Sequence, residues 1–276
     1  ADIGIAMGLA GTDVAKETAD IILLDDNFAT IVSAIEEGRA VYDNIRKFST
    51  YILASNVPEI VPFLGYGFIG MPLALTIPQV LAVDLGTDMV PALGLGMERP
   101  QPDVMDRPPR PIAERLLNTS LLLRAYLYLG LIEAAIAMGG FVLYLSIHGW
   151  TWGTPLDWSS PLYKEATTVT LAGIVFAQVA NVFACRSDRY SVFRLGWWTN
   201  PVILWGILFE VTILLLLIYT PVAHTIFGTR ALPVWIFAPL ALGAGLLLLA
   251  EESRKWIAAR LRQHRAHRLL QPAGGI

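Results

Sequence analysis

Six long apolar blocks limit what this chain can fold into more than any other feature of its sequence. They cover approximately residues 50–69, 73–97, 119–147, 166–185, 201–222 and 232–250. A helix needs roughly 20 apolar residues to cross the hydrocarbon core of a bilayer. Only 16% of the residues are charged, compared with about a quarter in soluble domains. We therefore predict a mainly α-helical, multi-pass integral membrane protein with six transmembrane spans within residues 51–250.

The basic residues indicate the orientation of these spans. Lys and Arg concentrate in the loops that face the cytoplasm of membrane proteins. If residues 31–50 are cytoplasmic, the three loops on the opposite side of the membrane contain only two basic residues, Lys164 and Arg230. Both chain ends are then cytoplasmic, and the basic tail over residues 251–276 forms either an interfacial helix near anionic lipids or a solvated terminus. The basic residues on the cytoplasmic side include Arg46, Lys47, Arg99, Arg107, Arg110, Arg115, Arg186, Arg189, Arg194, Arg254, Lys255, Arg260, Arg262, Arg265 and Arg268.

The first 50 residues differ from the rest of the chain. ADIGIAMG and IILLDD are typical of short buried strands, and GTDVAKETAD between them is typical of a turn that opens a helix. This order predicts the edge of an α/β domain over residues 1–30. Residues 31–50 continue without a break into the first apolar block, which predicts a rigid stalk helix. Because the sequence begins within a predicted strand and without Met, we interpret it as a fragment of a longer protein.

Three carboxylates lie within the first two apolar blocks. These carboxylates are Glu59, Asp84 and Asp88. Inserting one charged side chain at the centre of a bilayer costs about 2.5–3.5 kcal/mol of free energy, and neither block contains Lys or Arg that could pair with it. Asp84 and Asp88 share one helix face, and Asn56 and Ser55 lie about one turn before the glutamate. Such oxygen-bearing side chains suit Ca²⁺, Na⁺ or K⁺. We predict a buried cation site, with pairing to basic residues and a proton relay as the alternatives.

Prolines in the same two blocks remove backbone hydrogen bonds. Pro58 and Pro62 cannot donate to the carbonyl oxygens four residues earlier, and Pro91 leaves the carbonyl of Thr87 without its donor. Unwound backbone inside a membrane is tolerated where it lines a cavity or an ion site. We therefore expect unwound backbone at these positions, with carbonyl oxygens available as further ligands.

The later blocks contain other polar residues. Glu210 is a candidate for handling ions or protons. Gln178 and Asn181 either bind a cation or form hydrogen bonds between helices. We expect Arg124 to extend towards the cytoplasmic interface, and the sequence assigns no role to Glu133.

Four segments of the chain resemble parts of a known protein family. In chain order they are ADIGIAMG with GTDVAKETADIILLDDNFATIVSAIEEGR, then YILASNVPEI, then DLGTDMVPALGLGMERP and finally PDVMDRPPR. Together they resemble the C-terminal part of P-type cation-transporting ATPases, the family of the sodium–potassium and calcium pumps. The first segment resembles the end of the haloacid-dehalogenase-like phosphorylation domain, the next two resemble the fifth and sixth membrane helices, and the last resembles the loop that follows. The resemblance covers essentially the whole chain.

The resemblance implies roles for individual residues. Asn56, Glu59 and Asp88 match ligands of calcium and sodium–potassium pumps, whereas Asp84 and Ser55 match the sodium–potassium pattern. The third sodium site of such pumps is matched incompletely, because an alanine replaces a threonine at position 54 and an asparagine replaces an aspartate at position 181. The additional candidate ligands are Tyr51, Thr87, Gln178, Asn181 and Glu210.

The resemblance also implies an activity for the longer protein. ATP and Mg²⁺ would act upstream of residue 1, and an aspartyl-phosphate cycle would export Na⁺, K⁺, Ca²⁺ or H⁺ across the plasma membrane. The fragment holds no catalytic residue and should be inactive alone. Its expected partners are the lipid bilayer, the transported cation and the missing N-terminal domains. The formal charge of −3 argues against nucleic acid, and no feature indicates an accessory subunit. A cation- or proton-coupled secondary transporter is the alternative.

Overall fold

The computed structural model describes residues 2–111 and 113–270, so Ala1, Ile112 and the end of the basic tail at 271–276 lie outside the described residues. Helices dominate the described part, which confirms the mainly helical fold. In chain order the elements are β1 (Ile5–Met7), α1 (Asp13–Thr18), β2 (Ile21–Leu23), α2 (Thr30–Ile69), α3 (Ile77–Gly86), α4 (Met89–Gly96), α5 (Thr119–Leu122), the π-helix η1 (Leu123–Leu129), α6 (Gly130–Ile147), α7 (Pro161–Cys185), α8 (Val192–Leu195), α9 (Pro201–Tyr219), α10 (Pro221–Phe227), the 3₁₀ helix η2 (Val234–Ile236) and α11 (Phe237–Leu270).

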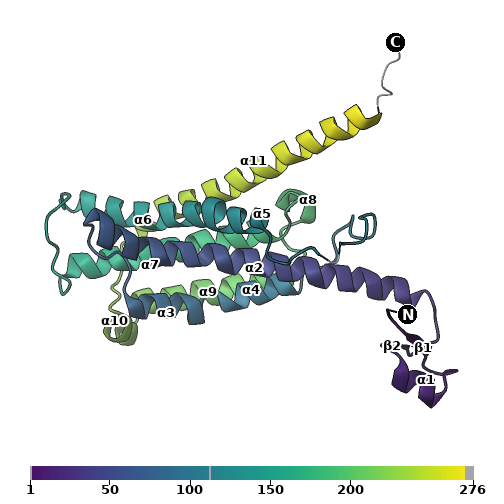
Figure 1. Ribbon diagram of the computed structural model, residues 1–276. Coiled ribbons are helices and arrows are strands. Elements are labelled where there is room, and N and C mark those ends of the chain that lie inside the picture. Colours follow the sequence, from purple (N-terminus) through teal and green to yellow (C-terminus); the bar gives the residue numbers. More distant parts are fainter. Residues whose placement is uncertain (1, 112, 271–276) are drawn as a thin grey trace, which may run out of the picture.

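The N-terminal unit has the strand–helix–strand order predicted for residues 1–30. Strands β1 and β2 pair in parallel, with Ile5 opposite Ile21. The carboxylate of Asp26 closes the unit, because its two oxygens accept hydrogen bonds from the backbone nitrogens of Leu9 and Ala10 at 2.8 and 2.7 Å. Figure 1 shows this unit at the end of α2 that lies farthest from the helical bundle.

Helix α2 joins this unit to the bundle without interruption. It is 40 residues long and contains both Pro58 and Pro62, so the unwinding predicted at these two prolines is wrong. Both prolines are buried, and packing against neighbouring helices can retain a helix that has lost two internal hydrogen bonds. The helix ends at Gly70, whose φ of 68° is the left-handed conformation that terminates many helices.

The second apolar block is not one continuous helix. It forms α3 and α4, with Thr87 and Asp88 between them. The backbone nitrogen of Asp88 donates to the carbonyl of Val83 at 3.1 Å, which is five residues back rather than four. Backbone departures of this kind often occur at functional sites. Five other helices in the described residues are long and apolar enough to cross a membrane. The break in the second block lies within one turn of Pro91, where the sequence predicts unwound backbone, and the count of six spans stays a prediction.

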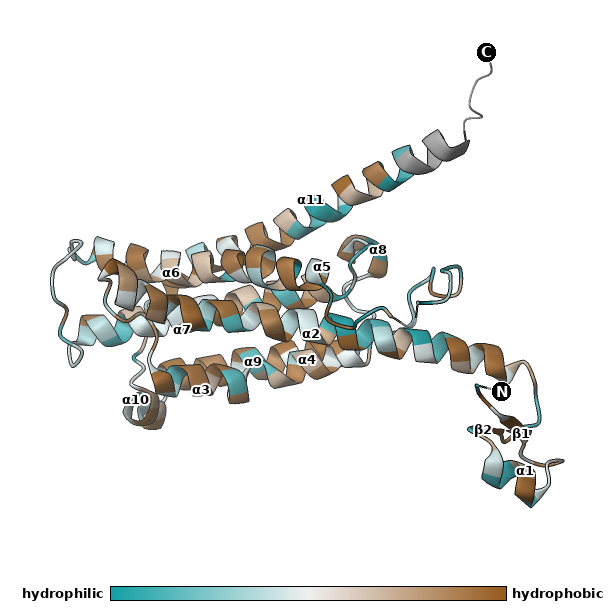
Figure 2. Ribbon diagram, in the orientation of Figure 1, coloured by the Kyte–Doolittle hydropathy of each residue, from teal (hydrophilic) through white to brown (hydrophobic). Residues whose placement is uncertain are grey.

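Helix α7 forms the centre of the bundle. Most of its side chains are buried, and it packs against α6, α11, α2 and α9. Small residues permit close approach between membrane helices: a Cβ atom added to Gly173 of α7 would lie 2.9 Å from Cα of Ala137 in α6. Hydrophobic residues cover the bundle, whereas hydrophilic ones concentrate in its connecting loops and in α11 beyond it (Figure 2).

A buried arginine fixes one end of the bundle. The side chain of Arg186 is 1% exposed and donates to both carboxylate oxygens of Glu98, at 2.9 and 2.8 Å. It also donates to the carbonyl of Gly196 and the hydroxyl of Thr199, both at 2.6 Å. Asn44 of α2 donates to the backbone carbonyl of Glu98 at 2.6 Å. The ends of α4 and α7 are therefore joined to the stalk part of α2.

The proline-rich loop after α4 folds against the same part of α2. Arg39 donates to the carbonyls of Val104 and Arg107 at 2.9 and 2.8 Å. Arg107 in turn pairs with Asp43 at 2.7 Å and with Asp103 at 2.6 Å. The hydrogen bond from Arg107 holds the pKa of Asp103 below its usual range. The loop is thus attached to α2 by ionic and backbone contacts.

Ion pairs join Arg124 to the start of the basic tail. The Arg124 side chain is 11% exposed and pairs with Asp188 and, at 2.7 Å, with Glu251. Glu251 also pairs with Arg254 at 2.7 Å. The start of the tail is held by these pairs, and α11 continues as far as Leu270.

Substituting Gly206 tests the packing behind the break between α3 and α4. A Cβ atom added there would lie 2.9 Å from the nitrogen and 3.0 Å from Cα of Pro91. Because backbone must move to admit it, we expect Gly206→Ala to lower the free energy of unfolding by about 1–3 kcal/mol. Gly139→Ala is the matched control, since no atom lies within 4 Å of its added Cβ. Equal unfolding curves in detergent for the two variants would contradict this packing.

Removing Arg186 tests the polar network. We expect Arg186→Met to lower the free energy of unfolding by about 3–5 kcal/mol, because it leaves the Glu98 carboxylate buried without its partner. The side chain of Arg189 is 48% exposed and pairs with Asp103 at 3.2 Å, so Arg189→Met should cost no more than about 1 kcal/mol. Chemical denaturation in mixed micelles measures the free energy of unfolding of both variants. A similar decrease for both would show that the Arg186 network stabilises the fold no more than the exposed Arg189 pair does.

Candidate cation site

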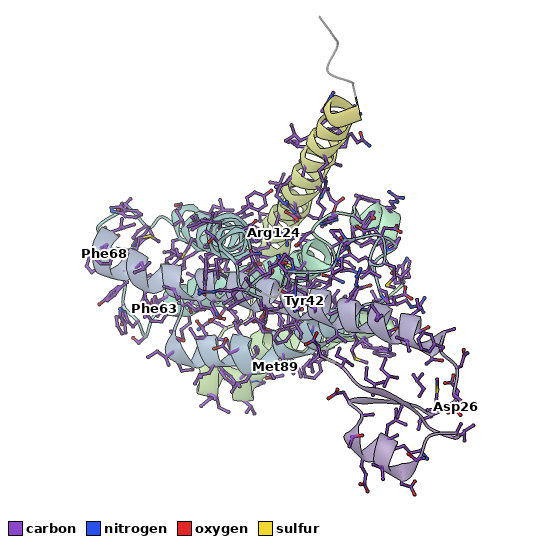
Figure 3. The ribbon with its side chains drawn as sticks, turned by 45° about the vertical axis from the view of Figure 1, so that its right-hand side comes forward. Asp26, Tyr42, Phe63, Phe68, Met89 and Arg124 are labelled. Carbon is purple, nitrogen blue, oxygen red and sulfur yellow. The ribbon has the colours of Figure 1, made fainter. Side chains whose placement is uncertain are left out.

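Three carboxylates meet where α2 passes the break between α3 and α4. Glu59 lies on α2, Asp84 on α3 and Asp88 directly before α4, and one oxygen of each lies within 4.8 Å of the others. Glu59 is 6% and Asp88 3% exposed, and Asp84 is half-buried. In Figure 3, Phe63 marks α2 one turn beyond the glutamate, and Met89 marks the first residue of α4.

The local backbone explains why these groups converge. The shifted hydrogen bond of Asp88 turns the chain between α3 and α4, so Asp84 and Asp88 are not held at the spacing of one regular helix. Pro91 removes a further donor from the next turn. The close approach of Gly206 in α9 to Pro91 supports the break from outside. The carboxylates of Asp84, on α3, and Asp88, at the break, therefore lie close to Glu59 on the continuous helix α2.

The other predicted ligands on α2 lie one or two turns before Glu59. Ser55 is fully buried, and its hydroxyl has no hydrogen-bond partner among the described residues. Asn56 is half-buried. Tyr51 is fully buried near Asp88, yet its hydroxyl also lacks a hydrogen bond of normal geometry. Helix α2 therefore brings two unsatisfied hydroxyl groups to the neighbourhood of the carboxylates.

Helix α7 contributes two buried amides. The hydroxyl of Thr87 donates to Oε1 of Gln178 at 3.4 Å and to the carbonyl of Val83 at 3.0 Å, which connects the break to α7. Asn181 accepts a hydrogen bond from the thiol of Cys185 at 3.3 Å. The amide nitrogens of Gln178 and Asn181 have no partner within the described part of the chain. Only part of the hydrogen-bonding capacity of these amides is therefore used between or within helices.

Two further glutamates are buried in the bundle. Glu210 of α9 and Glu133 of α6 are fully buried, and neither has a carboxylate oxygen with a hydrogen-bond partner among residues 2–111 and 113–270. The sequence predicts Glu210 as a candidate for handling ions or protons but assigns no role to Glu133. Its signal was present in the sequence: an acidic residue in an apolar block whose nearest basic residue, Arg124, is nine positions away.

The arrangement favours cation binding over pairing with basic residues. Within the described ranges, every ion pair that arginine or lysine forms is with a carboxylate other than Glu59, Asp84 and Asp88. Like charges at such short separation repel strongly in a medium of low dielectric constant. Carboxylate, hydroxyl and carbonyl oxygens are the ligands of hard cations. A bound cation, or protons, would offset the repulsion.

Comparison with known proteins gives one consistent result. Residues 72–257 match the family described as "Cation transporting ATPase, C-terminus". The sodium/potassium-transporting ATPase subunit alpha of Tetronarce californica is 37% identical over 291 residues, covering 94% of this chain and 28% of that protein. The subunit alpha of Drosophila melanogaster is 36% identical (93% and 27% coverage), and the subunit alpha-2 of Bos taurus 38% (94% and 28%). The chain thus spans little more than a quarter of the length of these relatives.

Cation-dependent stability tests the carboxylate cluster directly. We expect Na⁺, K⁺ or Ca²⁺ to raise the unfolding midpoint of the full-length protein, by a free energy of about 2.7 kcal/mol at 100 times the dissociation constant. Asp88→Asn should remove most of this effect. It should also stabilise the cation-free protein, because one repelling charge is gone.

Asp157→Asn is the matched control for this test. It makes the same chemical change in an exposed loop and should leave the response to cations unchanged. Thermal unfolding monitored with and without each cation provides the comparison. An Asp88→Asn protein that cations stabilise as much as the unsubstituted one would show that the cluster is not a cation site.

Proposed function

Because the chain belongs to the family of cation-transporting ATPases, we propose that it is the membrane ion-binding part of an ATP-driven cation pump. The observation that carries this proposal is the buried cluster of Glu59, Asp84 and Asp88. In the full-length protein an aspartyl-phosphate cycle would drive the export of the cation, with ATP and Mg²⁺ bound outside this chain.

In this proposal the three carboxylates bind the transported cation. Glu59 and Asp88 are the more buried of these carboxylates, and Asp84 is half-buried. Ser55 and Asn56 complete the ligand set from α2. The carbonyl of Thr87, which receives no hydrogen bond from Pro91, is available at the break. Helices α3 and α4 together act as a sixth, discontinuous span.

Helix α2 couples the cation site to the N-terminal unit. It extends from Thr30, directly after the strand–helix–strand unit, through Glu59 to Ile69. A displacement of its first turns therefore shifts Glu59 relative to Asp88, which belongs to the shorter α3–α4 segment. The contacts of Asn44 with Glu98 and of Arg107 with Asp43 link the same stalk to the loop after α4. Movement of the stalk can thus alter both sides of the cation site.

A monovalent cation fits this site best. The relatives that match the chain are named as sodium/potassium-transporting proteins, and Asp84 and Ser55 agree with the pattern of such pumps. Calcium is the competing cation, because carboxylate and amide oxygens also suit Ca²⁺. We further propose that the protein resides in the plasma membrane with both ends of this chain in the cytoplasm, in agreement with the distribution of its basic residues.

A cation- or proton-coupled secondary transporter is the second candidate. Transporters of that kind also place charged residues at broken helices. Membership of the ATPase family and the continuous helix between the strand–helix–strand unit and the bundle favour the pump. The two functions differ in one measurable respect, since only the pump requires ATP hydrolysis for transport.

Ion-stimulated ATP hydrolysis by the full-length protein tests the pump. We expect one of Na⁺, K⁺, Ca²⁺ and Mn²⁺ to stimulate hydrolysis, and Asp88→Asn to raise the concentration needed for half-maximal stimulation at least about tenfold, because it removes a ligand charge. Asp157→Asn should behave as the unsubstituted protein. Transport that continues without ATP would favour the secondary transporter, and unchanged stimulation of Asp88→Asn would refute the site assignment.

A further inference from the structure

A cavity of about 470 Å³ lies between the stalk part of α2 and the proline-rich loop after α4. Its size is typical of pockets that hold small molecules, which measure about 300–1,000 Å³. Residues 35–46 of α2, residues 104–114 of the loop and Arg189 beyond α7 contribute to its lining. Figure 3 labels Tyr42, which belongs to the α2 side of this cavity. None of the proposed cation ligands lines it.

The lining of the cavity carries an excess of positive charge. Five of its residues are arginines, at positions 39, 46, 107, 110 and 189. Its two carboxylates are already paired, Asp43 with Arg107 at 2.7 Å and Glu114 with Arg46 at 3.1 Å. A third carboxylate nearby, Asp103, is shared between two of the arginines. The carboxylates around the cavity therefore offset only part of its charge.

Two of the arginines form no ion pair among the described residues, namely Arg39 and Arg110. Arg39 donates through Nη1 to two backbone carbonyls of the loop. The guanidinium of Arg110 stacks on the ring of Tyr42, with its central carbon 3.6 Å from the ring centroid. Stacking uses the face of a guanidinium and leaves the N–H groups at its edge able to donate. Both arginines thus retain donors for a further acceptor.

The hydroxyl of Tyr42 is an independent sign that the cavity receives a polar ligand. It is buried and has no hydrogen-bond partner within residues 2–111 and 113–270. A hydroxyl that is buried without a partner costs free energy, so an acceptor beside it would stabilise the structure. Tyr42 follows Arg39 by three residues on α2, which places both on one face of the helix. The unsatisfied hydroxyl and the unpaired arginines therefore belong to the same cavity.

The chemistry of these donors selects the ligand. Guanidinium groups match the oxygens of phosphates and carboxylates through parallel hydrogen bonds, and the described lining contains arginine but no lysine. A carboxylate offers two oxygens in one plane. A phosphate group offers oxygens in several directions, and here the donors come from two segments, α2 and the loop. A phosphate group therefore uses the donors of this cavity more fully than a carboxylate does.

The cavity extends along α2 from the membrane surface into the water. Arg46 lies about four residues before the first apolar block and Arg39 about eleven, which correspond to roughly 6 and 16 Å along a helix. The head-group layer of a bilayer is about 5–8 Å thick on each side. The end near Arg46 is thus level with lipid phosphates, whereas the end near Arg39 is accessible to soluble phosphate compounds.

We propose that this cavity binds the phosphate group of an anionic ligand, which Arg39, Arg110 and Tyr42 hold by hydrogen bonds. The phosphate belongs to a lipid head group or to a soluble compound, since both carry the chemistry that the donors recognise. A ligand held from both sides would join the stalk to the loop after α4. The inference is independent of the proposed function, because it requires neither the transported cation nor ATP.

Phosphate binding to the full-length protein tests this site with two probes. The probes are radioactively labelled inorganic phosphate and labelled phosphatidic acid in mixed micelles. We expect Arg110→Gln to raise the concentration for half-saturation at least about tenfold for one of them, because it removes a charged donor. Tyr42→Phe, which removes one neutral donor, should raise it about threefold.

Arg115→Gln is the matched control. It makes the same chemical change at an exposed position of the same loop, outside the lining of the cavity, and should bind both probes as the unsubstituted protein does. Phosphate bound elsewhere in the protein contributes equally to all variants, so the difference between them reports on this cavity.

The two probes also distinguish the sources of the phosphate. Weaker binding of inorganic phosphate to Arg110→Gln supports a site for soluble phosphate, and weaker binding of phosphatidic acid alone supports a lipid site. Equal binding of each probe to Arg110→Gln and Arg115→Gln, whether unchanged or reduced in both, would overturn the proposal. If Arg110→Gln cannot be purified in folded form, Tyr42→Phe decides: weaker binding of either probe supports the site, and unchanged binding of both contradicts it.

Discussion

Repulsion among the buried carboxylates of Glu59, Asp84 and Asp88 is the constraint on which the rest of the membrane structure depends. One oxygen of each lies within 4.8 Å of the others, and burial of Glu59 and Asp88 weakens the screening of their charges by water. Folding into such an arrangement is unfavourable unless a cation or protons are bound, so the surrounding helices must hold the carboxylates together by packing. The close contact between Gly206 and Pro91 supplies such packing at the break. The cluster is stabilised by its scaffold and in turn favours an ion.

The arginines show why this charge is left for a cation. Arg186 is engaged by Glu98, Arg107 by Asp43, and Arg124 by Glu251. Each pair joins segments at one end of the bundle and holds positive charge away from the membrane carboxylates. A guanidinium group paired with Glu59 or Asp88 would neutralise a carboxylate of the cluster and compete with a cation for it. The separation of paired charges from unpaired ones therefore agrees with the proposed cation site.

The sequence predicted the features that depend on local spacing. Apolar block length identified the helices, and the positions of Glu59, Asp84 and Asp88 along the chain indicated a shared site. Features that depend on tertiary partners were harder to predict. Pro58 and Pro62 each remove one backbone hydrogen bond, as Pro91 does, yet only Pro91 lies near a break. Whether a turn weakened in this way stays helical depends on its packing against neighbouring helices. Arg124 could not be placed because its partners, Asp188 and Glu251, are distant in the sequence.

Helix α2 and the α3–α4 segment differ in continuity on the two sides of the proposed cation site. A continuous 40-residue helix transmits a displacement along its whole length, whereas a segment divided at Thr87 and Asp88 can adjust its two halves separately. Glu59 belongs to the first kind of element and Asp88 to the second. In the proposed pump, a small movement of the stalk would alter the distance between these carboxylates without requiring the bundle to repack. Because a cation needs its ligand oxygens at fixed distances, such a movement would weaken binding at the proposed site.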